Sequence, residues 1–112
     1  MVVEYIRYTV PAAAADDFMA AYRQAGRVLD ADPHCAAYEV ARGVEEPGNF
    51  VVRIEWDSIE GHEQGFRSSP AFREFFAAVR PFFADIAEMK HYQVQHGGGG
   101  ADVRTPSGDA RS

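Results

Sequence analysis

Three things are scarce in this sequence: cysteine, positive charge and long apolar runs. Cys35 is the single cysteine of 112 residues, so neither an intrachain disulfide nor a cysteine-based metal site can form. The net charge of −6 repels phosphate groups and anionic lipids, so we expect no nucleic-acid or membrane partner. No apolar run approaches the roughly 20 residues of a membrane span, and the first ten residues, which contain Glu4 and Arg7, lack a signal-peptide pattern. We therefore expect a cytoplasmic protein.

What is present is enough for one globular domain. A chain of 112 residues has the length of a single domain of roughly 100–150 residues. Its hydrophobic share of 46% and its eight phenylalanines indicate a dense aromatic core. The glycines at 97–100 and the Pro-, Ser-, Asp- and Arg-rich residues after them offer no apolar face. We expect a folded domain over residues 1–95 and a flexible Gly-rich tail over residues 96–112.

Alternating side chains predict three strands. Residues 1–10 place Val2, Ile6, Tyr8 and Val10 on one face, which is typical of a strand. Residues 35–41 alternate more weakly. Residues 50–56 alternate most clearly, with Phe50, Val52, Ile54 and Trp56 on one side.

Two helical regions lie between and after these strands. The first runs from about Asp16 to about Leu29, with an apolar face that repeats every three to four residues. The second is broken into a short piece that contains Ile59, His62 and Phe66 and a longer piece that begins at Ser69-Pro70. The longer piece carries an apolar stripe of Phe72, Phe75, Phe76, Val79, Phe82, Phe83 and Ile86. Residues 90–94 are left as a short fourth strand.

The resulting order, β-α-β-β-α-β, predicts an α+β fold of the ferredoxin-like class. In this arrangement two helices cover one face of an antiparallel sheet and leave the other face open. Tyr5, Val51, Arg53 and Glu55 fall on that open face and mix apolar with charged groups. We expect a homodimer through this sheet face, in which Arg53 and Glu55 form ion pairs across the interface.

One segment resembles a known family. Residues 50–62, Phe-Val-Val-Arg-Ile-Glu-Trp-Asp-Ser-Ile-Glu-Gly-His, and residues 68–75, Ser-Ser-Pro-Ala-Phe-Arg-Glu-Phe, resemble the antibiotic biosynthesis monooxygenase family, and the resemblance spans residues 2–94. It implies a dimeric α/β barrel that oxidises polyketide-like phenols or quinols with O₂, often without metal or flavin. Because the superfamily also holds isomerases and haem-degrading enzymes, the fold alone does not fix the reaction.

Two departures from the family pattern restrict what the resemblance implies. Many relatives have a second histidine nine residues after the tryptophan, where this chain has Gly65. The haem-degrading relatives use an Asn, a Trp and a His at positions that align with Ile6, Gly65 and Phe75. Haem degradation is therefore not expected.

The candidate site combines one base with an aromatic wall. His62 is the candidate catalytic base, because a neutral imidazole suits proton abstraction near pH 7, and we expect its ring at an exposed edge. Trp56, Tyr8, Tyr22 and Phe66 are candidate substrate-binding residues. A place in the core is the simpler interpretation of Trp56, and buried tyrosines commonly use their hydroxyls only to satisfy their own hydrogen bonding. The alternative for His62 is a surface or packing histidine.

We expect no cofactor and no metal site, because the sequence shows no Gly-rich phosphate loop, nucleophile elbow or closely spaced set of metal ligands. His34 stands next to Cys35 on an extended segment, where neighbouring side chains point apart. We expect His91 and His96, near the end of the last strand, to be solvated.

The predicted function is a cofactor-independent monooxygenase acting on an aromatic, polyketide-like or quinol molecule. A non-catalytic binding or accessory module, favoured by Gly65, and a small cofactor-free isomerase are the alternatives.

Overall fold

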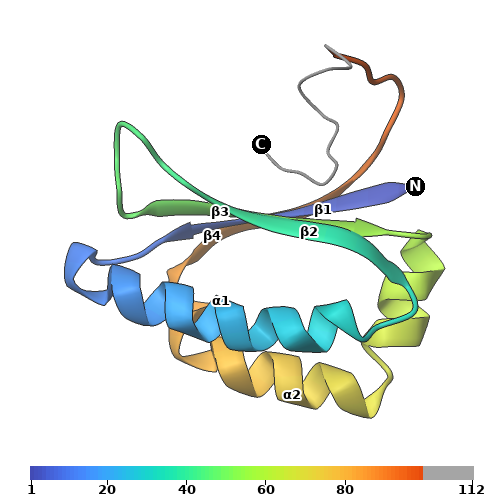
Figure 1. The fold of residues 1–112 in the computed structure, drawn as a ribbon, viewed down its shortest axis with the longest axis horizontal. Helices are drawn as coiled ribbons and strands as arrows, with labels where there is room; N and C mark the ends of the chain where they lie inside the picture. Colours follow the sequence, from blue (N-terminus) through green and yellow to red (C-terminus); the bar gives the residue numbers. More distant parts are fainter. Residues whose placement is uncertain (100–112) are drawn as a thin grey trace.

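The computed structural model describes residues 1–99 and contains one four-stranded sheet with two main helices (Figure 1). The strands are β1 (Val2–Thr9), β2 (Cys35–Arg42), β3 (Asn49–Trp56) and β4 (Ile86–Gln93). The helices are α1 (Ala15–Asp30) and α2 (Pro70–Val79), joined to the rest by the 3₁₀ turns η1 (Ala12–Ala14) and η3 (Arg80–Asp85) and by the π-helix η2 (Gly61–Phe66). The predicted tail begins at residue 96, and its residues 100–112 lie outside the described residues.

The strand order is β2-β3-β1-β4, and every neighbouring pair is antiparallel. Both helices lie against the same face of the sheet, while the other face carries no helix (Figure 1). This is the ferredoxin-like α+β fold, so the predicted fold class is confirmed. Among residues 1–99, no helix has the length and apolar character needed to cross a membrane.

The core lies between the sheet and the helices, as the alternation of β1 and β3 predicts. Phe50, Val52, Ile54 and Trp56 of β3 are each at most 1% exposed. Phe18, Tyr22 and Leu29 of α1 pack against them and are equally buried. Burial of such side chains contributes roughly 1.5–3 kcal/mol each, and this term dominates the stability of so small a domain.

The prediction of one long apolar helix through residue 86 is wrong. Helix α2 ends at Val79, because Pro81 lacks an N–H and its ring obstructs the helical path. Phe82 and Phe83 belong to η3, and Ile86 is the first residue of β4. Strand β4 therefore starts four residues before the predicted residue 90, which brings Ile86 and Met89 to the edge of a cavity.

The open face of the sheet is partly apolar. Tyr5 and Tyr92 meet edge to face with ring centroids 5.5 Å apart, and Val3 beside them is 2% exposed. Arg53 and Glu55 form an ion pair with each other within the chain, so the structure accounts for both charges without a partner. Interface ion pairs between these two residues and a second copy remain a prediction.

Candidate functional site

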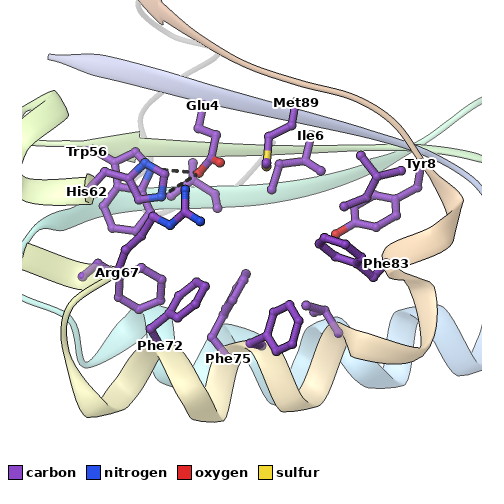
Figure 2. A pocket seen from close by; sticks show the side chains of 15 residues that line it. Glu4, Ile6, Tyr8, Trp56, His62, Arg67, Phe72, Phe75, Phe83 and Met89 are labelled. Atoms are coloured by element: carbon purple, nitrogen blue, oxygen red, sulfur yellow. Dashed lines mark hydrogen bonds and ion pairs between the residues drawn. The ribbon is translucent and has the colours of Figure 1, made fainter. Parts of the chain in front are cut away.

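A cavity of about 200 Å³ lies between the sheet and the second helical region. Its walls are aromatic and aliphatic side chains from β1, β3, η2, α2, η3 and β4, with polar groups gathered at one end (Figure 2). The lining residues are Glu4, Ile6, Tyr8, Ile54, Trp56, His62, Phe66, Arg67, Phe72, Phe75, Phe76, Val79, Phe83, Ile86 and Met89. A mostly apolar cavity with few, convergent polar groups is typical of a small-molecule site.

Glu4, His62 and Trp56 form the polar end of the cavity, and Arg67 extends toward Glu4 (Figure 2). Trp56 Nε1 donates a hydrogen bond to Glu4 Oε1 at 3.1 Å, and His62 Nε2 lies 3.6 Å from the same oxygen. The imidazole of His62 stacks on the Trp56 indole at 4.4 Å between centroids. Its Nδ1 shares a hydrogen bond of 2.7 Å with Nε2 of His91, so these groups form one connected cluster.

The π-helix η2 is what presents His62 and Phe66 to the cavity. Gly65 in this turn is tightly packed, because a Cβ at residue 65 would lie 2.5 Å from Cδ2 of His34. His34 is held in this place by a hydrogen bond of 2.9 Å from its Nδ1 to Oδ2 of Asp57. Gly65, where the family resemblance leads one to expect a second histidine, is thus packed against the imidazole of His34. Single π-turns frequently occur at functional sites.

Burial sets the protonation of the polar end. It raises the pKa of the Glu4 carboxyl from 4.5 to about 7, although the Trp56 hydrogen bond and the Arg67 charge oppose the rise. Burial, with the charges of His91 and Arg67, lowers the pKa of His62 from 6.5 to about 4. Near pH 7 the imidazole of His62 is therefore neutral, and the carboxyl of Glu4 can accept or release a proton.

Tyr8, which pairs with Tyr22, lies at the other end of the cavity (Figure 2). The hydroxyls of Tyr8 and Tyr22 are 2.6 Å apart and buried, and either one can donate. Burial raises the pKa of Tyr8 to about 12 and that of Tyr22 well above its ordinary value, so both stay protonated near neutral pH. Tyr8 lines the cavity, whereas Tyr22 supports it from α1 without lining it.

The structure brings four of the five predicted site residues to the cavity wall, namely His62, Trp56, Tyr8 and Phe66. The expected exposed edge for His62 is wrong, because this residue is only 5% exposed and stacks on Trp56. His91 is half-buried and bonded to His62 rather than solvated.

Sequence reasoning missed Glu4, Arg67 and His91 as parts of the site. Glu4 could have been found, because it lies two residues before Ile6 and four before Tyr8 in β1 and therefore falls on the same, core-facing side of the strand. His91 could not, because its role depends on the register that pairs it with Glu4. Together Glu4, His62 and His91 also form a set that could hold a metal ion.

Comparisons with known proteins bear on the family and the fold of the chain. A family model for antibiotic biosynthesis monooxygenases matches residues 1–78. YczJ, an uncharacterised protein of Bacillus subtilis, is 26% identical over 77 residues, which are 69% of this chain and 81% of YczJ.

Two solved structures share the fold. One, from Bordetella bronchiseptica and assigned to the same family, has a TM-score of 0.75 at 24% identity and covers 85% of this chain and 97% of its own. SnoaB of Streptomyces nogalater, described as a cofactor-independent oxygenase, has a TM-score of 0.69 at 15% identity. The match covers 86% of this chain and 94% of the SnoaB chain.

Proposed function

The chain belongs to the antibiotic biosynthesis monooxygenase family, and from this premise we propose that it oxidises a phenol or quinol with O₂ and without a cofactor. The single observation that carries the proposal is the aromatic cavity with one proton-exchanging polar end. An apolar cavity of about 150 Å³ holds a benzene ring, so about 200 Å³ suits one substituted ring, or two rings after small side-chain movements. A polyketide-like substrate would therefore insert only its reacting ring.

The proposed reaction begins with loss of the phenolic proton. The Glu4 carboxylate accepts this proton, and the nearby Arg67 charge stabilises the substrate anion. The electron-rich anion transfers one electron to O₂, and the resulting superoxide and substrate radical combine to a hydroperoxide. Loss of water then leaves a carbonyl, so that a hydroquinone and O₂ give a hydroxyquinone and H₂O. The substrate supplies all the electrons that oxygen gains.

His62 has a different part in this scheme from the one predicted from sequence. With a pKa near 4 its neutral imidazole is a weak base at pH 7, whereas a base with a pKa near the working pH is the most effective. His62 instead lies beside the Glu4 carboxyl, with its Nε2 3.6 Å from Oε1, and its Nδ1 shares a hydrogen bond with His91. We therefore assign proton acceptance to Glu4 and positioning to His62.

The proposal is tested by oxygen consumption. Chelator-treated protein is mixed with a panel of hydroquinones, naphthohydroquinones and anthrones in air, with catalase and superoxide dismutase present to remove products of free autoxidation. At least one compound should be consumed with one O₂ per product. Glu4→Gln should lower kcat by about 10²–10⁴-fold, the usual contribution of a general base. Glu63→Gln, which removes an exposed carboxylate from the same π-helix, should leave kcat unchanged.

The accessory-module alternative has its own support in Gly65, whose place many relatives fill with histidine. Saturable binding of a panel compound without oxygen consumption would favour this alternative. Oxidation that is equally fast in Glu4→Gln would retain the oxygenase and remove the base assignment.

A further inference from the structure

The polar end of the cavity has the composition of a metal site. Within residues 1–99, donor atoms of Glu4, His62 and His91 lie within 4.8 Å of one another. One carboxylate and two imidazoles form a donor set that suits divalent ions such as Fe²⁺, Co²⁺ and Zn²⁺. We propose that Glu4, His62 and His91 bind one divalent transition-metal ion at this end of the cavity.

The candidate donor atoms lie within 4.8 Å of one another, somewhat farther apart than around a bound ion. Donors at about 2.0–2.2 Å from one ion lie roughly 3.0–3.5 Å from each other. His62 Nδ1 and His91 Nε2 are 2.7 Å apart, and His62 Nε2 lies 3.6 Å from Glu4 Oε1. Because only one nitrogen of His62 can bind the ion, small rotations of its ring and of the Glu4 side chain complete the set.

The three ligands come from three elements whose relative position is fixed by other contacts. Glu4 of β1 and His91 of β4 are direct cross-strand partners in the sheet. His62 is held on η2 by stacking against Trp56. Trp56 Nε1 also donates to Glu4 Oε1, and such a hydrogen bond to a ligating carboxylate is the usual support of a metal ligand. The three side chains are therefore held near one another before any ion arrives, and only local rotations are needed to bind it.

Hydrogen bonding alone explains the contact between His62 and His91, but it leaves the position of Glu4 costly. Glu4 is only 3% exposed. An ionised carboxylate that is so deeply buried is unfavourable unless it is paired with a positive group or bound to a metal. A divalent cation would offset this cost. Because Glu4 and His62 both line the cavity, the remaining coordination positions of the ion would face a small-molecule ligand.

One nearby charge opposes a cation. Arg67 extends from the end of η2 toward Glu4 (Figure 2) and lowers the pKa of His62 through its positive charge. Arg67 is exposed, so its long side chain has room to turn toward solvent when an ion binds. Replacing Arg67 with glutamine should therefore tighten binding of the ion.

This inference is independent of the proposed function, because metal binding is measured without substrate. The two are also linked, since a bound ion would occupy the Glu4 oxygen that the proposed reaction uses as a base. The apo and metal-bound cluster are therefore alternative states of one site, and an ion that binds should inhibit cofactor-free oxidation.

The experiment uses the full chain without an affinity tag, made metal-free with a chelator and then dialysed. Zn²⁺ is titrated by calorimetry, and Co²⁺ is titrated by its visible absorption, which reports the ligands directly. Wild type should bind one ion per chain. Glu4→Gln and His91→Gln should each weaken binding by at least about 10–100-fold. Loss of a residue that only hydrogen-bonds to a metal ligand already costs this much, and loss of a ligand should cost no less.

Three further measurements make the result decisive. His96→Gln, which removes an exposed histidine outside the cluster, should bind as wild type does, and circular dichroism should show that every variant is folded. Arg67→Gln should bind more tightly. No saturable binding by wild type, or equal binding by wild type, Glu4→Gln and His91→Gln, would overturn the proposed site while leaving the oxygenase proposal untouched.

Discussion

Replacing Glu4 with glutamine should stabilise the protein, and only at high pH. Glutamine is a neutral substitute for the protonated carboxyl, so the two side chains are nearly equivalent at low pH. In the wild type, the folded-state pKa of about 7 exceeds the ordinary value of 4.5, so the folded state holds this proton more tightly. Its stabilising effect is present below pH 4.5 and is lost as the pH rises through 7. Each pKa unit is worth about 1.4 kcal/mol, which makes the total loss roughly 3 kcal/mol.

The difference in unfolding free energy between Glu4→Gln and wild type should therefore grow by roughly 3 kcal/mol from the acid to the alkaline side of this window. Urea denaturation at fixed protein concentration and with chelator present measures it at each pH. Glu63→Gln is the matched control and should show no such growth, because its carboxylate is exposed. A difference for Glu4→Gln that does not change with pH would refute the raised pKa and, with it, the assignment of Glu4 as base.

Three other predictions concern the surroundings of the site. Tyr8→Phe should destabilise the fold by about 1–3 kcal/mol in urea denaturation, because it leaves the buried Tyr22 hydroxyl without its partner. The double variant with Tyr22→Phe should recover part of this loss. Purely additive effects of the two substitutions would contradict an energetic coupling between the two hydroxyls. Gly65→Ala should lower the melting temperature, because its Cβ meets His34, and His34→Ala should relieve the clash; an unchanged melting temperature would contradict this packing. Sedimentation at micromolar concentration should give twice the chain mass, because the open sheet face is partly apolar; a monomer would contradict the predicted dimer.

The sequence predicts the sheet better than the second helical region. Alternation in β1 and β3 is a strong signal, because one face is buried and a shift by one residue would expose it. The apolar stripe from Phe72 to Ile86 predicts too long a helix, because its phenylalanines keep helical spacing past Pro81, where the helix has already ended. Proline was the better evidence, because its effect is steric and local.

The site was only half predictable for a physical reason. Its walls, Phe66 among them, follow from apolar periodicity, and the resemblance points to Trp56 and His62. The polar cluster instead depends on β4 pairing with β1 and on the wide turn of η2. Both are long-range or irregular features that no local pattern specifies, so His91 could not be recognised as a neighbour of His62.

We propose Glu4 as the base for oxidation by O₂ in a metal-free cavity. The most direct test is the rate of oxygen consumption by chelator-treated protein, measured with one quinol at pH values below and above the pKa of Glu4. For the wild type, kcat/KM should rise with pH through about 7 and then level off, because the carboxylate is the active form. In Glu4→Gln this rise should vanish and the rate should be lower throughout. An identical rate and pH profile in the two proteins, or no oxygen consumption by the wild type, would contradict the account.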